Sequence, residues 1–370
     1  MSEEPATAEN KVEHLGFLDG MRGIAALYVV LYHAVVSWTG PIPESAIHRR
    51  FPLFMFGHYA VTVFIVLSGF CLMLPVARTN DLPLRGGIVG FMKRRSRRIL
   101  PAYYATLAAA FLVPPIVTIL VFNAPSMGQY TWCGFSGRSD LLLHIALLHN
   151  LGRHSSQSIL PPLWSIATEF QIYIVFALLL LPIMRRFGGL AQMLTAILVA
   201  IVPFALFAPR HNCLGAFPWL LIAFSIGMIS ARVLHTSVKV AIAPAVACIV
   251  LLFMPAKFFP SGWPVDMLQQ DTIAALIAGA LIVFCCHSPA NLMRRLLEWR
   301  PFVWLGRSSY SLYLTHYLVI SGLEATFIGV RPMRMMMRPV LTLLLGVPLS
   351  VLFAQLFFHY FERPYLKSKK

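Results

Sequence analysis

Arginine, histidine and glutamate side chains inside apolar stretches are the features of this sequence that call for a chemical role. The stretch LDGMRGIAALYVVLYHA, residues 18–34, holds Arg22 near its start and His33 near its end. Eleven helical residues turn about 20° past three full turns, so both side chains lie on one face, about 16 Å apart along the axis. An imidazole inside a membrane-spanning helix must face the bundle or a wet cavity and find a partner. His33 is therefore a candidate catalytic base, whereas Arg22 alone also suits a side chain that extends to the headgroups.

A carboxylate at matching depth is the candidate partner of His33. Glu169 lies in PPLWSIATEFQIYIVF, and a helix that enters near Leu163 places it about 9 Å below the membrane surface. His33 lies about 8 Å below the same surface if its helix ends near Trp38. A carboxylate beside an imidazole fixes which ring nitrogen is basic, so we predict that Glu169 orients His33. The alternative is that Glu169 only hydrogen-bonds a neighbouring helix.

A basic cluster precedes another apolar run in FMKRRSRRILPAYY, residues 91–104. Such clusters usually set membrane topology or contact anionic lipids. Arg95 and Arg98 would nevertheless lie near the same membrane surface as Arg22, and guanidinium groups bind phosphate in a bidentate manner. A phosphorylated donor held there, with an arm long enough to reach His33, matches coenzyme A and its pantetheine. These residues favour acyl-CoA as the donor substrate.

The composition places these residues in a polytopic membrane protein. The chain has 370 residues, of which 58% are hydrophobic and 12% charged, and its mean hydropathy is +0.73. This composition is too apolar for a soluble domain. The formal net charge of +16 is no sign of nucleic-acid binding, because basic residues of membrane proteins collect on the cytoplasmic side. Membrane lipid is therefore an expected partner, and nucleic acid is not.

At about 20 apolar residues per span, the sequence predicts an all-α bundle of about ten transmembrane helices. The expected spans are residues 19–38, 56–77, 99–121, 163–183, 188–208, 215–234, 240–256, 270–287, 302–322 and 339–360. Most lysines and arginines then fall on the side of the two termini, which predicts that both termini are cytoplasmic. The apolar LLLHIALLHN in the long segment 122–162 is too short to cross, so this segment should re-enter the membrane or lie at the interface.

The bundle is expected to be one domain, residues 18–362, between a short cytoplasmic tail (1–17) and a basic cytoplasmic tail (363–370). The first seventeen residues lack the basic start of a signal peptide, so the first helix should be retained. The six cysteines form no CxxC pair or other metal-ligand spacing, and we expect no metal cofactor. Cys133 and Cys213 fall in loops predicted to lie outside, and whether they pair stays open.

Several ordered motifs resemble those of the acyltransferase 3 family of integral membrane acyltransferases. The family signature of an arginine or lysine, ten residues and a histidine corresponds to Arg22 and His33 in FLDGMRGIAALYVVLYH. The other similar stretches, in order, are VFIVLSGF with Ser68, RRSRRILPAYY with Arg95 and Arg98, PLWSIATEFQIY with Trp164 and Glu169, SSYSLYLTHY with Tyr310 and His316, and the closing FERPY. The resemblance covers nearly the whole chain.

The resemblance implies O-acylation of a carbohydrate or glycoconjugate hydroxyl at the outer face, with acyl-CoA supplied from the cytoplasm. A bacterial inner membrane is the expected setting. His33 would act as general base on the acceptor hydroxyl, or as a nucleophile that forms an acyl-imidazole. Glu169 would orient His33, and the CoA phosphates would be bound by Arg22, Arg95 and Arg98. The identities of the acyl group and the acceptor, and the oligomeric state, stay open.

Further motif residues are candidates for supporting roles. His316 is an ionisable group near the bundle core that favours a role in holding helices together over a chemical one. Trp164 either stacks on a sugar ring or belongs to the aromatic belt of the membrane interface. Ser68 and Tyr310 belong to motifs that the family shares.

The chain departs from the family pattern in one motif and leaves a rival function open. The family often has Gly-Val-Asp before FFVLSGF, where this chain has Ala60, Val61 and Thr62, so no acidic role is implied there. We expect no hydrolase-like domain after the last helix, so the acceptor should be handled by the membrane domain or by a separate protein. The rival is a transporter or channel in which Arg, His and Glu form a substrate or proton path.

Overall fold

The structure is a computed structural model that describes residues 15–36, 49–79, 84, 86–122, 137–152, 155–207, 214–235, 265–288, 290–325 and 337–366, with side chains in all but 114–122, 203–207 and 214. Every regular element in these ranges is a helix, as the all-α prediction requires. The helix predicted at 240–256, Cys133 and Cys213, residues 1–14 and 367–370, and part of 122–162 lie outside the described residues.

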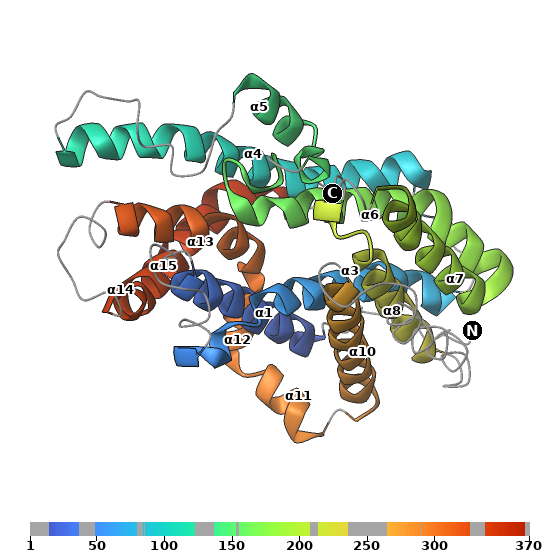
Figure 1. Cartoon of the computed structure of the whole chain (residues 1–370). Helices are drawn as coiled ribbons and strands as arrows, with labels where there is room; N and C mark the ends of the chain where they lie inside the picture. The colour runs from blue at the N-terminus through green and yellow to red at the C-terminus, as the bar shows by residue number, and fades with distance from the viewer. Residues whose placement is uncertain are drawn as a thin grey trace, which may run out of the picture.

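The helices pack side by side into a bundle (Figure 1). The α-helices are α1 (Gly16–Val36), α3 (Gly57–Thr79), α4 (Gly87–Phe122), α5 (Arg138–Ile145), α6 (Trp164–Val175), α7 (Leu181–Phe207), α8 (Leu220–Val233), α10 (Val265–His287), α11 (Leu292–Leu297), α12 (Arg300–Arg307), α13 (Ser309–Leu323), α14 (Met337–Leu341), α15 (Val347–Phe357) and α16 (Arg363–Leu366). Five stretches within the described ranges are long and apolar enough to cross a membrane: Gly16–Val36, Pro52–Ala77, Pro161–Val202, Val265–His287 and Met337–Leu366.

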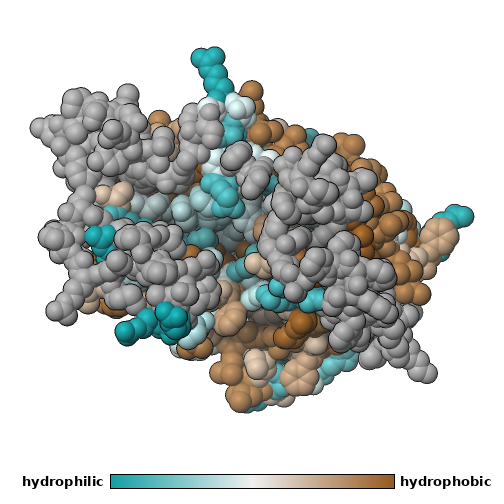
Figure 2. Space-filling model, in the orientation of Figure 1, coloured by the Kyte–Doolittle hydropathy of each residue, from teal (hydrophilic) through white to brown (hydrophobic). Residues whose placement is uncertain are grey.

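Short helices of other types join or extend these elements. The 3-10 turns are η1 (Pro52–Phe54), η2 (His149–Leu151), η3 (Ser155–Gln157), η4 (Pro161–Leu163) and η7 (Leu214–Ala216), and the π-helical turns are η5 (Phe176–Leu180), η9 (Thr342–Gly346) and η10 (Phe358–Glu362). The outer surface of α7 exposes apolar side chains about every fourth residue, including Leu190, Leu194 and Leu198. Figure 2 shows hydrophobic surface on the side where α7 lies. This pattern fits a lipid-facing helix.

One predicted helix boundary differs from the structure, and another agrees with it. The span predicted at 302–322 is wrong as one helix, because it breaks at Ser308 into α12 and α13. The buried Glu362 carboxylate accepts hydrogen bonds from the Ser311 backbone N–H at 3.1 Å and from Ser311 Oγ at 2.5 Å. It thereby satisfies one of the N–H groups in the first turn of α13 that have no partner within the helix. The break predicted just before 188 is present at Gly188, where φ is 84°.

The functional helices are held together by close backbone contacts at glycines. A Cβ added to Gly20 would lie 1.7 Å from the Leu297 carbonyl oxygen, and one added to Gly306 would lie 1.9 Å from that of Asp19. The α3–α8 contact is built in the same way, because a Cβ on Gly227 would lie 2.1 Å from the Val66 carbonyl oxygen. Small residues permit this approach between helices in lipid, where apolar surface alone gives little drive for association.

The described part of 122–162 folds back onto the bundle. It contains α5, which at eight residues is too short to cross a membrane. The hydroxyl groups of Tyr103 and Tyr104 donate to the carbonyl oxygens of His144 and Ile145, each at 2.9 Å. Asn150 hydrogen-bonds α6 through the Thr168 and Gln171 side chains. These contacts attach the segment to α4 and α6, which both contribute to the site below.

We expect Gly227→Ala to lower the thermal unfolding midpoint of the detergent-solubilised protein by several degrees. The added Cβ would force α8 away from α3, and overpacking of this kind costs about 1–3 kcal/mol. The matched control is Gly16→Ala in α1, whose Cβ would meet its nearest neighbour, Glu298 Cγ, at an ordinary 3.6 Å. Equal midpoints for the two variants would contradict the close contact.

Candidate active site

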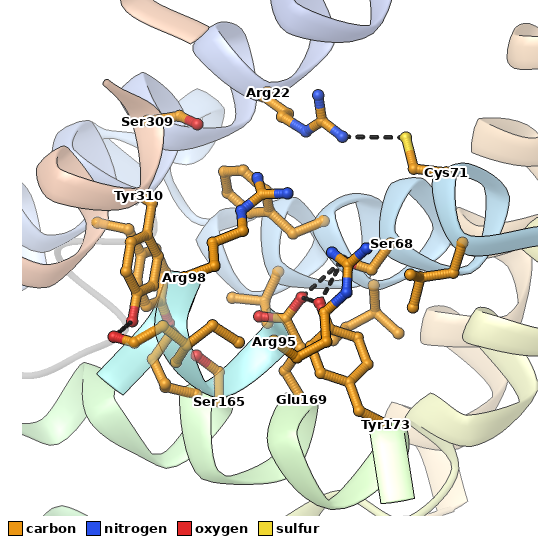
Figure 3. A pocket seen from close by; sticks show the side chains of 17 residues that line it. Arg22, Ser68, Cys71, Arg95, Arg98, Ser165, Glu169, Tyr173, Ser309 and Tyr310 are labelled. Carbon is orange, nitrogen blue, oxygen red and sulfur yellow. Dashed lines mark hydrogen bonds between the residues drawn. The ribbon is translucent and has the colours of Figure 1, made fainter. Parts of the chain in front are cut away.

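A cavity opens between α1, α3, α4, α6 and α13 (Figure 3). Its walls combine apolar residues, most of them from α3, with charged or hydroxyl side chains from all five helices. The polar lining residues are Arg22, Ser68, Cys71, Arg95, Arg98, Ser165, Glu169, Tyr173, Ser309, Tyr310 and Tyr313. Six residues from the sequence motifs therefore line one cavity: Arg22, Ser68, Arg95, Arg98, Glu169 and Tyr310.

The three predicted phosphate ligands line this cavity together. Arg22 of α1 donates to Asp19 Oδ1 at 2.9 Å and to Cys71 Sγ at 3.0 Å. Arg95 and Arg98 come from the same face of α4, because residues three apart in a helix are neighbours. The Arg95 guanidinium lies over the rings of Phe91 and Tyr173, with its central carbon 5.7 and 5.8 Å from the ring centroids. Figure 3 shows the three guanidinium groups directed into the cavity.

Glu169 binds hydroxyl groups at the centre of the cavity and not the predicted histidine. Its Oε1 accepts hydrogen bonds from Ser68 Oγ at 2.6 Å and from Tyr173 Oη at 2.5 Å, and Arg95 is close enough to interact with it electrostatically. The expected contact between Glu169 and His33 is therefore wrong in this structure. The rise per residue predicts a similar depth in the membrane for the two side chains. Whether they face each other depends on how each helix is rotated about its own axis, and packing between helices sets that rotation.

His33 instead lies beside other rings of α1 and α13. The centroid of its imidazole is 5.1 Å from that of His316 and 5.4 Å from that of Tyr317, in an edge-on arrangement with the latter. Its own neighbour Tyr32 lies 5.0 Å away. His33 is not among the residues that line the cavity. The ionisable neighbour that the structure gives His33 is thus His316.

His316 is buried in one defined tautomer. Its Nδ1 lies 2.7 Å from the Tyr313 carbonyl oxygen and 3.1 Å from that of Leu312. A carbonyl oxygen only accepts, so Nδ1 carries the hydrogen and donates it. Its Nε2 is buried and has no hydrogen-bond partner within the described ranges. A neutral His316 therefore offers a basic lone pair on Nε2 in the immediate surroundings of His33.

Tyr313 connects the cavity to this histidine pair, and sequence reasoning missed it. Its hydroxyl lies 2.6 Å from Ser165 Oγ and donates to the Pro162 carbonyl at 3.0 Å. Its ring lines the cavity and lies 5.8 Å from the ring of His316. The signal was present in SSYSLYLTHY, where three-residue spacing puts Tyr310, Tyr313 and His316 along one helix face. Tyr310 ties α13 to α4 by donating to the Ile99 carbonyl at 3.0 Å.

The remaining candidate, Trp164, begins α6 next to the cavity residue Ser165. Its ring lies 5.8 Å from the imidazole of His58 in a stacked arrangement and 4.3 Å from the ring of Phe217. In the part of the chain that the structure describes, no group of three or more His, Cys, Asp or Glu side chains is placed to hold a metal ion. The cavity's donors are guanidinium and hydroxyl groups, which suit an anionic organic ligand.

We expect Glu169 to be coupled to Ser68 and not to His33 in double-mutant cycles of stability. Glu169→Ala leaves two buried hydroxyl groups without their acceptor, so the thermal midpoint should fall, and Ser68→Ala added to it should cost little more. His33→Ala combined with Glu169→Ala should be additive within about 0.5 kcal/mol. Additivity for Ser68 together with coupling for His33 would contradict the structure.

The chain is similar over most of its length to proteins named as O-acetyltransferases. The family model described as an acyltransferase domain matches residues 15–359. One relative, named "Putative peptidoglycan O-acetyltransferase YrhL", from Bacillus subtilis, is 26% identical over 94% of this chain. O-acetyltransferase OatA of Staphylococcus aureus is 22% identical over 96% of the chain, and peptidoglycan O-acetyltransferase OatA of Listeria monocytogenes is 23% identical over 95%.

The chain spans 54%, 58% and 56% of the lengths of these three relatives. No solved structure matches it. The family match covers the helices that form the arginine-lined cavity and the histidine pair. The chain belongs to the acyltransferase 3 family, as its motifs predicted.

Proposed function

We propose that this protein is a membrane O-acetyltransferase that transfers an acetyl group from acetyl-CoA to a hydroxyl group of a polysaccharide. The observation that carries this proposal is one cavity with three guanidinium groups at one end and a histidine pair beyond Tyr313 near its other end. The names of the relatives support an acetyl group and a glycan acceptor such as peptidoglycan. The match to an acyltransferase family favours this function over the alternative of a transporter or channel.

The arginines suit the phosphates of coenzyme A. Asp19, the carboxylate that Arg22 contacts, is absent from the cavity lining, so the positive ends face inward. His33 follows Arg22 by eleven positions in α1, which corresponds to about 16 Å along the helix axis. An extended pantetheine arm has a comparable length, so phosphates at the arginines would place the thioester near the histidines. The donor would enter from the side of Arg95 and Arg98, which we propose to be cytoplasmic.

The acyl transfer itself needs one proton acceptor and one proton donor. As His33 takes the proton of the acceptor hydroxyl, the oxygen attacks the thioester carbonyl and the carbon–sulfur bond breaks. The departing thiolate then receives the proton, which gives an ester and free CoA thiol. In the alternative route, His33 attacks first and holds the acyl group as an acyl-imidazole. In both routes we propose that His316, the ring beside His33, acts as its positioning residue.

We place the protein in the bacterial inner membrane with both termini in the cytoplasm. The relatives named above come from bacteria, and the basic residues of the sequence favour this orientation. The acceptor hydroxyl would then approach from the outer side, where α1 ends beyond His33 and α6 begins at Trp164. This arrangement lets a cytoplasmic donor modify a glycan on the other side of the membrane.

Cys71 provides a direct test of the donor site, because its sulfur contacts Arg22 inside the cavity. We expect desulfo-CoA, which has no thiol of its own, to slow maleimide labelling of Cys71 at least fivefold. Pantothenate, which lacks the phosphates, should not protect. Cys286 of α10 serves as the internal control and should label at an unchanged rate, with both sites quantified by peptide mass spectrometry. Unchanged labelling of Cys71 at saturating desulfo-CoA would exclude the cavity as the nucleotide site.

The catalytic role is tested with purified protein in lipid, labelled acetyl-CoA and peptidoglycan fragments. His33→Ala should reduce label transfer at least about 100-fold, because general bases contribute about 10²–10⁴-fold. His359→Ala is the matched control, since this exposed histidine contacts Arg363 and the Tyr360 ring, lies outside the cavity lining and should keep full activity. Label trapped on wild-type protein without acceptor would establish the acyl-imidazole route. Full transfer by His33→Ala would refute the assignment.

A further inference from the structure

A buried carboxylate outside the cavity gathers hydrogen bonds from two neighbouring elements. Asp271 of α10 is 1% exposed and accepts from His58 Nε2 at 2.8 Å, from Thr62 Oγ1 at 2.5 Å and from Trp219 Nε1 at 2.7 Å. Thr62 occupies the position where the family often has aspartate, so here a carboxylate reaches that place from another helix. Three donors occupy most of the lone pairs of Asp271, which leaves it a supporting role rather than direct contact with a ligand.

His58 is the accessible member of this pair. Its side chain is 17% exposed, compared with 1% for Asp271. The carboxylate accepts the hydrogen of Nε2, so the neutral imidazole carries its lone pair on Nδ1. Asp271 therefore holds His58 in the tautomer that presents a hydrogen-bond acceptor on the other side of the ring. The same arrangement of carboxylate and histidine is used to prepare a histidine for a ligand in other proteins.

The pair lies at the end of the cavity that is remote from the arginines. On α3 the cavity extends from Cys71, which contacts Arg22, to Val61. His58 lies three residues beyond Val61 in the same direction, which places it about 20 Å from Cys71 along the helix axis. On α6 the corresponding end is Ser165. The neighbouring residue Trp164 stacks on the His58 ring.

Tyr59, whose ring lies 6.1 Å from that of His58, pairs with Gln270, the residue before Asp271, at an open groove between α3 and α10. The Tyr59 hydroxyl donates to Gln270 Oε1, which leaves the two amide hydrogens of the exposed Gln270 free to donate to another molecule. Phe217 packs 4.9 Å from the His58 ring and has φ of +47°. A bulky residue in the left-handed region is strained, and such strain is typical of functional sites.

We propose that His58, held by Asp271, and Gln270 form a subsite that binds neighbouring hydroxyl groups of the carbohydrate acceptor. One sugar hydroxyl donates to His58 Nδ1, and an adjacent oxygen accepts from the Gln270 amide. Asp271 is a positioning residue that fixes the tautomer. This proposal rests on the proposed function, because it assigns the acceptor to the end of the cavity opposite the CoA phosphates.

The alternative is that the network only ties α3 to α10. In that case variants of His58 would lower stability and would weaken donor and acceptor binding together. A selective loss of carbohydrate binding is a result that this structural role does not produce. The experiment therefore measures the two ligands separately on the same protein.

The probe is tetra-N-acetylchitotetraose, a soluble glycan, whose binding to full-length protein in lipid nanodiscs is measured by equilibrium dialysis. We expect His58→Phe, which keeps an aromatic ring between Trp164 and Phe217, to raise the Kd of the probe at least tenfold. Protection of Cys71 by desulfo-CoA should stay unchanged. His58→Gln keeps a donor for Asp271 and an outward acceptor, so it should recover part of the affinity. His287→Phe, at the other end of α10, is the matched control and should bind like wild type.

Absence of probe binding by wild type, or equal Kd values for wild type and His58→Phe, would overturn the subsite. Parallel loss of probe binding and of Cys71 protection in His58→Phe would assign the network a structural role and also overturn it. Failure of the proposed function is a separate result, because it would appear as no acetyl-CoA turnover and no protection of Cys71 in wild type.

Discussion

Guanidinium groups inside an apolar helix bundle are the constraint on which the rest of this structure depends. An uncompensated charge removed from water costs several kcal/mol, so each arginine needs polar partners at the correct distance. Arg22 finds them in Asp19 and Cys71, and Arg95 is surrounded by Glu169 and two aromatic rings. The partners hold the arginines in place while leaving their charged ends toward a shared cavity, which is the arrangement that an anionic ligand requires.

Close helix contacts give this cavity its shape. Gly20 brings α1 to α11 and Gly306 brings α12 to α1 at backbone distance, and Gly227 does the same for α8 and α3. The chain then breaks at Ser308, and α13 begins in a new direction with its first turn stabilised by Glu362. This break lets α13 place hydroxyl groups in the cavity and His316 beside His33. The glycines and the break therefore contribute to function without contacting any substrate.

Hydroxyl groups connect the charged and the histidine ends of the site. Glu169 gathers Ser68 and Tyr173 from two helices, while Tyr313 is joined to Ser165 and lies beside His316. Buried polar groups in lipid are costly unless they are paired, so these networks also specify how α3, α6 and α13 pack. The same hydrogen bonds thus hold the bundle together and line the route between the proposed donor and acceptor ends.

The sequence by itself determined the helical class, the membrane character and the identity of the arginine, glutamate and histidine candidates. These follow from hydropathy and from the 1.5 Å rise per residue, which sets the depth of each side chain along its own helix. Only the tertiary structure decided their partners: Glu169 with Ser68 rather than His33, and His33 with His316. Depth is a local property of one helix, whereas a partner depends on how two helices rotate about their axes, and that rotation is set by packing between residues far apart in the chain.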